Sequence, residues 1–214
     1  MNGITDSVLV LLVLSCFLLL GAGRVAASIR ILAIQGFMVG MLPLVLHDGA
    51  PGFRLVLIGG AIAVLKGIVL PRWLARTLRD TGICHETPPL IGNATSILLG
   101  VAALVAIFWL EQRLNLPVSA STALAVSTGF MLMATGLFLI IARSMALHQV
   151  IGYLALENGM YMFGLAVVRD IPLLVELGVL VDLIVAVFVM GIAINRIARK
   201  FAHADSDQLS MLKG

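Results

Sequence analysis

The chain has 214 residues, of which 61% are hydrophobic and only 12% are charged. Because an average globular domain carries about 25% charged residues, this composition excludes a soluble globular protein and indicates an integral membrane protein. The formal net charge of +3 is typical of basic loop ends that orient membrane spans, and it does not indicate nucleic-acid binding.

The apolar runs are continuous rather than alternating, so the predicted spans are helices and not barrel strands. A helix needs about 20 apolar residues to cross a bilayer core of about 30 Å. The first run lacks a basic leader and a small-residue cleavage site, and we expect it to be retained. Turn-rich stretches separate seven runs, which predict membrane helices at 5–22, 27–46, 54–71, 93–110, 119–142, 146–168 and 171–195.

Basic residues orient these helices, since positive charges concentrate in cytoplasmic loops. With the N-terminus outside, nine basic residues fall inside: Arg24, Arg72, Arg76, Arg79, Arg143, Arg196, Arg199, Lys200 and Lys213. Three fall in outside loops: Arg54, Arg113 and Arg169. A six-helix arrangement would break this bias. The sequence therefore predicts a multi-pass protein with an outside N-terminus and a cytoplasmic C-terminus.

Two parts of the chain share a layout. The stretches "GRVAASIRILAIQGFMVGMLPLV" and "ARSMALHQVIGYLALENGMYMFGLAVV" each follow one span and precede a span with an ionisable residue. This layout predicts two parallel repeats of three helices joined by the fourth, although any two apolar stretches share some likeness. We expect a four-helix membrane region at 1–115, a three-helix unit at 116–200 and a cytoplasmic tail at 201–214.

Two carboxylates lie near the centres of predicted spans. Glu157 is in the middle of the span at 146–168, and Asp182 is near the centre of the next span. A short turn joins these antiparallel helices, so we expect both carboxylates at a similar depth. An Asp at the membrane centre costs about 2.5–3.5 kcal/mol on insertion scales, and removal from water favours a protonated carboxyl group. We interpret the two residues as a candidate proton relay.

Three further ionisable residues are candidates for the same relay. Lys66 shares a helix face with Gly59 and Ala63, which predicts either an inward-facing amine that relays protons or a side chain that snorkels to the interface. Glu176, near the outer end of the last span, is either a proton uptake or release group or an interfacial side chain. His148, at the cytoplasmic start of the span at 146–168, is either a relay end or an interfacial histidine.

Small and amide residues predict close packing around Glu157. Gly152 and Gly159 lie seven residues apart on one helix face, so we expect a neighbouring backbone to approach there. For Gln35 and Asn158, both in the middle of spans, interhelical hydrogen bonds are the favoured interpretation.

No catalytic constellation occurs in the sequence. Cys16 and Cys84 have no C-x-x-C spacing, and no cysteine cluster is suited to an iron–sulfur centre. The sequence predicts no cofactor, no metal site and no enzymatic activity of this chain by itself.

The C-terminal part carries a family resemblance. The stretches "IGYLALENGMYMFGLAVV", "PLLVELGVLVDLIVAVFVMGIAINRIARKF" and "DSDQLSMLKG" resemble the hydrogenase-4 component E (HyfE) family. The last three predicted helices also resemble NuoK of respiratory complex I and MrpC of multisubunit cation/proton antiporters, which place one glutamate in the middle helix and one in the last. Glu157 and Asp182 fall on those positions, with the second acid one methylene shorter.

The resemblance implies a non-catalytic membrane-arm subunit of a group 4 nickel–iron hydrogenase complex in the bacterial cytoplasmic (inner) membrane. Such a subunit would form part of the proton path and bridge antiporter-like subunits, with the soluble hydrogenase arm contacted only indirectly. The alternative is a structural scaffold in the same or a related complex I/Mrp-type assembly. A stand-alone transporter is disfavoured, because the chain is short and no broken helices are evident.

Overall fold

A computed structural model of the chain describes residues 3–46, 52–80, 91–114 and 120–167. Every regular element in these ranges is helical, which confirms the predicted all-helical class. Five helices are long and apolar enough to cross a membrane, and they agree with five predicted spans. They are α1 (Gly3–Gly21), α2 (Val25–Leu46), α5 (Asn93–Leu114), α6 (Ala120–Ala142) and α7 (Ala146–Val167).

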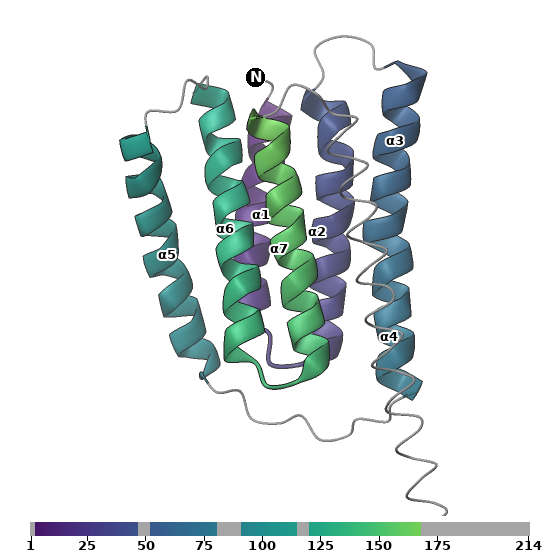
Figure 1. Cartoon of the computed structure of the whole chain (residues 1–214), viewed down its shortest axis with the longest axis vertical. Helices are drawn as coiled ribbons and strands as arrows, with labels where there is room; N and C mark the ends of the chain where they lie inside the picture. The colour runs from purple at the N-terminus through teal and green to yellow at the C-terminus, as the bar shows by residue number, and fades with distance from the viewer. Residues whose placement is uncertain (1–2, 47–51, 81–90, 115–119, 168–214) are drawn as a thin grey trace, which may run out of the picture.

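The predicted span at 54–71 lies in a longer column of three consecutive elements (Figure 1). These are α3 (Phe53–Val64), the π-helical turn η1 (Leu65–Val69) and α4 (Leu70–Asp80). Their 12, 5 and 11 residues extend about 40 Å at about 1.5 Å per residue. The column is therefore longer than the bilayer core of about 30 Å.

The predicted span ends at residue 71. In the structure, however, the helix continues through Pro71. Proline lacks an N–H and its ring clashes with the carbonyl four residues earlier, but a local π-helical adjustment accommodates it inside a membrane helix. Here the turn just before Pro71 is widened, since the Leu70 N–H bonds to the Leu65 carbonyl. The helix continues into α4, where Arg72, Arg76 and Arg79 are exposed.

The helices run up and down in an antiparallel arrangement (Figure 1). Short connections between α1 and α2 and between α6 and α7 make each pair an antiparallel hairpin. The two hairpins pack together through α1 with α6 and through α2 with α7. On one side α5 packs against α6 and α1, and on the other the α3–η1–α4 column packs against α2.

The two helices of the α6–α7 hairpin approach closely through glycines. A Cβ atom at Gly152 would lie 2.7 Å from the Gly136 carbonyl oxygen, and one at Gly159 would lie 2.6 Å from the Met133 nitrogen. Gly129 faces the backbone of α7 in the same way. Only glycine admits a neighbouring backbone at these distances, which confirms the prediction for Gly152 and Gly159.

A second close contact joins α2 to η1 and α3. A Cβ atom at Gly36 would lie 2.7 Å from the Lys66 carbonyl oxygen, and one at Gly40 would lie 2.5 Å from the Ala63 nitrogen. Gly36 and Gly40 have the G-x-x-x-G spacing typical of tightly packed membrane helices. The backbone that carries Lys66 is thus pressed against α2.

The predicted span at 171–195 and the tail at 201–214 lie outside the described residues. The number of seven spans, the three-plus-three repeat and the division at 115 and 200 therefore stay predictions. The orientation of the two termini relative to the membrane also stays a prediction.

Candidate functional site

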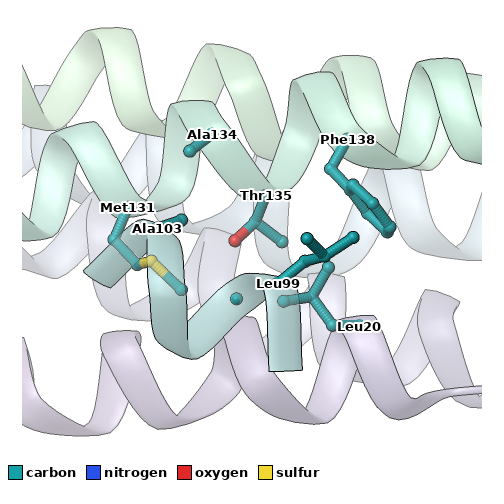
Figure 2. A pocket seen from close by; sticks show the side chains of 8 residues that line it. Leu20, Leu99, Ala103, Met131, Ala134, Thr135 and Phe138 are labelled. Atoms are coloured by element: carbon teal, nitrogen blue, oxygen red, sulfur yellow. The ribbon is translucent and has the colours of Figure 1, made fainter. Parts of the chain in front are cut away.

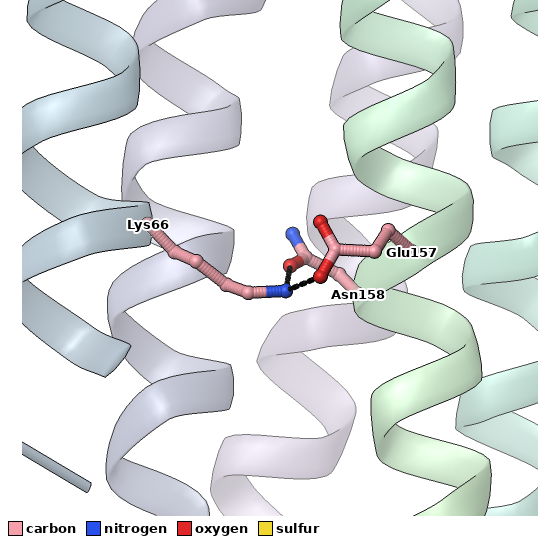
Figure 3. A network of polar contacts seen from close by, with 3 residues as sticks. All are labelled: Lys66, Glu157 and Asn158. Atoms are coloured by element: carbon pink, nitrogen blue, oxygen red, sulfur yellow. Dashed lines mark hydrogen bonds and ion pairs between the residues drawn. The ribbon is translucent and has the colours of Figure 1, made fainter. Parts of the chain in front are cut away.

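Lys66 and Glu157 form an ion pair inside the bundle. Lys66 extends from η1 past α2 toward α7, and Figure 3 shows its amine between the carboxylate of Glu157 and the amide of Asn158. The Lys66 Nζ atom pairs with Glu157 Oε1 and donates to Asn158 Oδ1 at 3.3 Å. The Lys66 and Glu157 side chains are only 4% and 3% exposed, so both charges are removed from solvent.

This geometry decides the direction of the Lys66 side chain, while its role in a proton relay stays a prediction. It faces inward and reaches α7, so it does not snorkel to an interface. A charge inside a membrane protein is costly unless it is paired and hydrogen-bonded, and the contacts with Glu157 and Asn158 supply both conditions. The predicted interhelical hydrogen bond of Asn158 is confirmed.

Two backbone features position the amine. Lys66 lies within the π-helical turn η1, a type of irregularity that often marks functional sites in helices. The contact of Gly36 with the Lys66 backbone holds this turn against α2, which also packs against α7. The sequence alone did not predict the π turn.

Tyr161 also belongs to this site and was missed in the sequence. The Lys66 Nζ atom lies 5.5 Å from the centroid of the Tyr161 ring, within the range of a cation–π interaction. Tyr161 follows Glu157 by four residues, so the two share a face of α7. That spacing from a mid-span acid was the signal that could have found it.

His148 is buried in the first turn of α7. It precedes Glu157 by nine residues, or about two and a half turns at 3.6 residues per turn, which places the two on opposite sides of the helix. His148 instead shares the face of Gly152 and Gly159, which packs against α6. The structure does not bring His148 to the ion pair, and its role as a relay end stays a prediction.

Asp182 and Glu176 lie outside the described residues. The expected position of Glu157 and Asp182 at a similar depth therefore stays a prediction. The structure shows Lys66 as an ion-pair partner of Glu157.

A second buried polar cluster joins α2 to α1. The Gln35 Nε2 atom donates to Ser15 Oγ at 2.9 Å, and Ser15 Oγ donates to the Leu12 carbonyl at 2.5 Å. Cys16 lies beside this cluster, with its sulfur 3.8 Å from Gln35 Nε2. The predicted interhelical hydrogen bond of Gln35 is confirmed, and it stabilises the α1–α2 hairpin.

A small pocket lies between α1, α5 and α6 (Figure 2), and its lining does not include the residues of the ion pair. Its volume is about 140 Å³, and the Thr135 hydroxyl is the polar group among its side chains. The lining residues are Leu20, Leu99, Gly100, Ala103, Met131, Ala134, Thr135 and Phe138. Within the described ranges, no group of His, Cys, Asp and Glu residues is arranged to hold a metal ion.

Arg143 ties three helix ends together in the turn between α6 and α7. Its Nη2 atom donates to the Leu20 carbonyl at the end of α1 at 3.2 Å and to Asn93 Oδ1 at the start of α5 at 3.3 Å. A cation at the C-terminal end of a helix interacts favourably with the helix dipole. Arg143 therefore stabilises the packing of these helix ends. Its place in a cytoplasmic turn stays a prediction.

The fold and the site define a multi-pass helical membrane protein with a buried lysine–glutamate pair. The chain is 31% identical over 203 residues to the uncharacterized protein Rv0085 of Mycobacterium tuberculosis, covering 94% of this chain and 92% of that protein. The chain belongs to the same family as this mycobacterial protein.

Hydrogenase-4 component E of Escherichia coli K12 is a more distant homologue. It is 28% identical over 163 residues, which cover 75% of this chain and 74% of that protein, and the same figures hold for hydrogenase-4 component E of Shigella flexneri. This homology supports the first family resemblance, while the likeness to NuoK and MrpC stays a prediction. No family model and no solved structure matches the chain.

Proposed function

We propose that the chain is a non-catalytic subunit of a hydrogenase-type complex in the bacterial inner membrane and forms part of its proton path. The observation that carries the proposal is the buried Lys66–Glu157 pair, which joins η1 to α7 across the bundle. Homology to hydrogenase-4 component E supports membership in such a complex. The electron-transfer chemistry takes place in other subunits.

The pair has the chemistry that a proton relay needs. A proton that reaches Glu157 neutralises the carboxylate and removes its attraction for Lys66, which is strong at low dielectric constant. The Lys66 ammonium group then lacks its counter-ion, and its proton can pass to a further acceptor along the path. Asn158 stays as an acceptor that holds the amine in place. We place Asp182, Glu176 and His148 further along this path.

The outer face of α5 supports the proposed role as a bridge between antiporter-like subunits. Leu98, Val105 and Trp109 are 70%, 65% and 59% exposed, and among the described helices α5 packs mainly against α1 and α6. Such a face suits lipid chains or the helices of a neighbouring membrane subunit.

The test replaces Glu157 by glutamine, which keeps the shape of the side chain but removes the titratable group. We expect the assembled complex to lose proton translocation, because the relay can no longer take up a proton at this position. The measurement is dye quenching in inverted membrane vesicles energised by the electron-transfer reaction of the complex. Asp182→Asn should act in the same way. Full coupling in both variants, with normal assembly, contradicts the proposal.

The second candidate is a structural scaffold without proton conduction. The direct pairing of two buried charges favours it, because removing one partner of such a pair costs about 3–5 kcal/mol. The scaffold predicts that Glu157→Gln lowers the amount of assembled complex on native gels, whereas the proton path predicts assembled complex that is uncoupled.

A further inference from the structure

The Tyr161 hydroxyl is a buried polar group for which the described residues supply no partner. Tyr161 is 4% exposed, and its hydroxyl oxygen has no hydrogen-bond partner in the part of the chain that the structure describes. A buried tyrosine hydroxyl usually finds a partner. Where protein groups do not supply one, an ordered water commonly does.

The Lys66 amine lies over the ring that carries this hydroxyl. The Lys66 ammonium group has three N–H donors, and its hydrogen bonds within the described chain go to Glu157 and Asn158. Among the described residues, no hydrogen-bond acceptor is shown for the third donor. The Lys66 Nζ atom lies over the Tyr161 ring, 5.5 Å from its centroid, so the amine and the side chain that carries the hydroxyl belong to one buried site.

Helix geometry gives the position of Tyr161 relative to Glu157 along α7. Tyr161 follows Glu157 by four residues, which is about 6 Å along α7 toward its C-terminal end. Side chains in helices lean toward the N-terminal end, so the ring leans back over the amine. Tyr161 is thus the next polar residue after Glu157 on this face of α7, toward the C-terminal end of the helix.

We propose that an ordered water joins the Tyr161 hydroxyl to the Lys66–Glu157 pair, and that Tyr161 is the next proton-carrying group toward the C-terminal end of α7. This inference rests on the proposed function. In each step the hydroxyl oxygen accepts a proton from one neighbour and gives its own proton to the other. The O–H bond that forms replaces the one that breaks, so no charge stays on the ring.

The test is Tyr161→Phe, which keeps the ring, its packing and the cation–π contact and removes only the hydroxyl. We expect proton translocation by the assembled complex to fall about tenfold, below the range of about 10²–10⁴ typical of a positioned proton-transfer group, because water partly replaces the hydroxyl. The matched control is Tyr153→Phe, a partly buried tyrosine on the same helix, which should leave translocation unchanged.

The outcomes separate this inference from the proposed function. If Tyr161→Phe behaves like Tyr153→Phe while Glu157→Gln abolishes translocation, the inference is overturned and the proposed function stands. If neither Tyr161→Phe nor Glu157→Gln affects translocation, both are overturned. Should Tyr161→Phe fail to assemble, a high-resolution structure of the unmodified complex decides. Water density about 2.7–3.2 Å from both the Tyr161 hydroxyl and Lys66 Nζ supports the inference, and its absence contradicts it.

Discussion

At the residue scale, the question is what a buried lysine and a buried glutamate do for this protein. Each charge alone would be expensive inside a membrane, and the pair with its Asn158 hydrogen bond offsets much of that cost. A pair that only held helices together could be replaced by apolar side chains. A pair that relays protons could not.

The double variant Lys66→Met/Glu157→Leu uses this difference. Replacing a buried ion pair by hydrophobic residues of similar volume is often neutral or stabilising by about 1–4 kcal/mol. We expect the double variant to assemble as well as the unmodified chain and to lose proton translocation. The measurements are the amount of complex on native gels and dye quenching in vesicles. Assembled complex with full translocation would identify the pair as structural.

The residues of this site were predictable to different degrees. Glu157 and Lys66 were found because a charge in an apolar run is unusual. Tyr161 was missed, because an aromatic residue in a span does not indicate a site unless its neighbours are known. Only the structure shows that the Lys66 amine lies over the Tyr161 ring.

At the element scale, glycines decide how closely the helices approach. Gly129, Gly136, Gly152 and Gly159 bring α6 and α7 into backbone contact, and Gly36 does the same for α2 and η1. These contacts hold the two elements that carry Glu157 and Lys66. The π turn that contains Lys66 packs against Gly36, so substitutions at these glycines should displace the site residues.

Gly159→Ala tests this packing. Its Cβ atom would lie 2.6 Å from the Met133 nitrogen, so α6 and α7 must move apart. We expect a loss of stability of about 1–3 kcal/mol, measured as a lower midpoint of thermal unfolding of the detergent-solubilised complex. Gly60→Ala is the control, since no atom of the other described elements lies within 4 Å of its added Cβ and alanine favours a helix more than glycine. Equal midpoints in both variants would contradict this account.

At the scale of the whole molecule, two antiparallel hairpins form the centre, with α5 on one side and the α3–η1–α4 column on the other. The exposed arginines of α4 and the Arg143 turn lie at the same end of the bundle, together with the α1–α2 connection. This common location agrees with the predicted cytoplasmic side, since basic residues stay there.

The orientation can be measured with C-terminal fusions. We expect a fluorescent protein that matures only in the cytoplasm to be active at the C-terminus, and an alkaline phosphatase that needs export to be inactive, because the basic residues favour the cytoplasmic side. The reverse pattern would overturn the predicted topology and, with it, the direction assigned to the proton path.

The sequence by itself determined the class of protein, the helical form of its spans and most of their bounds. The reason is local, since a chain in hydrocarbon must satisfy its backbone hydrogen bonds within each helix, and apolar runs therefore mark the helices directly. Only the tertiary structure decided that Lys66 meets Glu157, 91 residues away in the chain. That contact depends on which helices the glycines bring together, and the choice of neighbouring helix does not follow from the local pattern of residues.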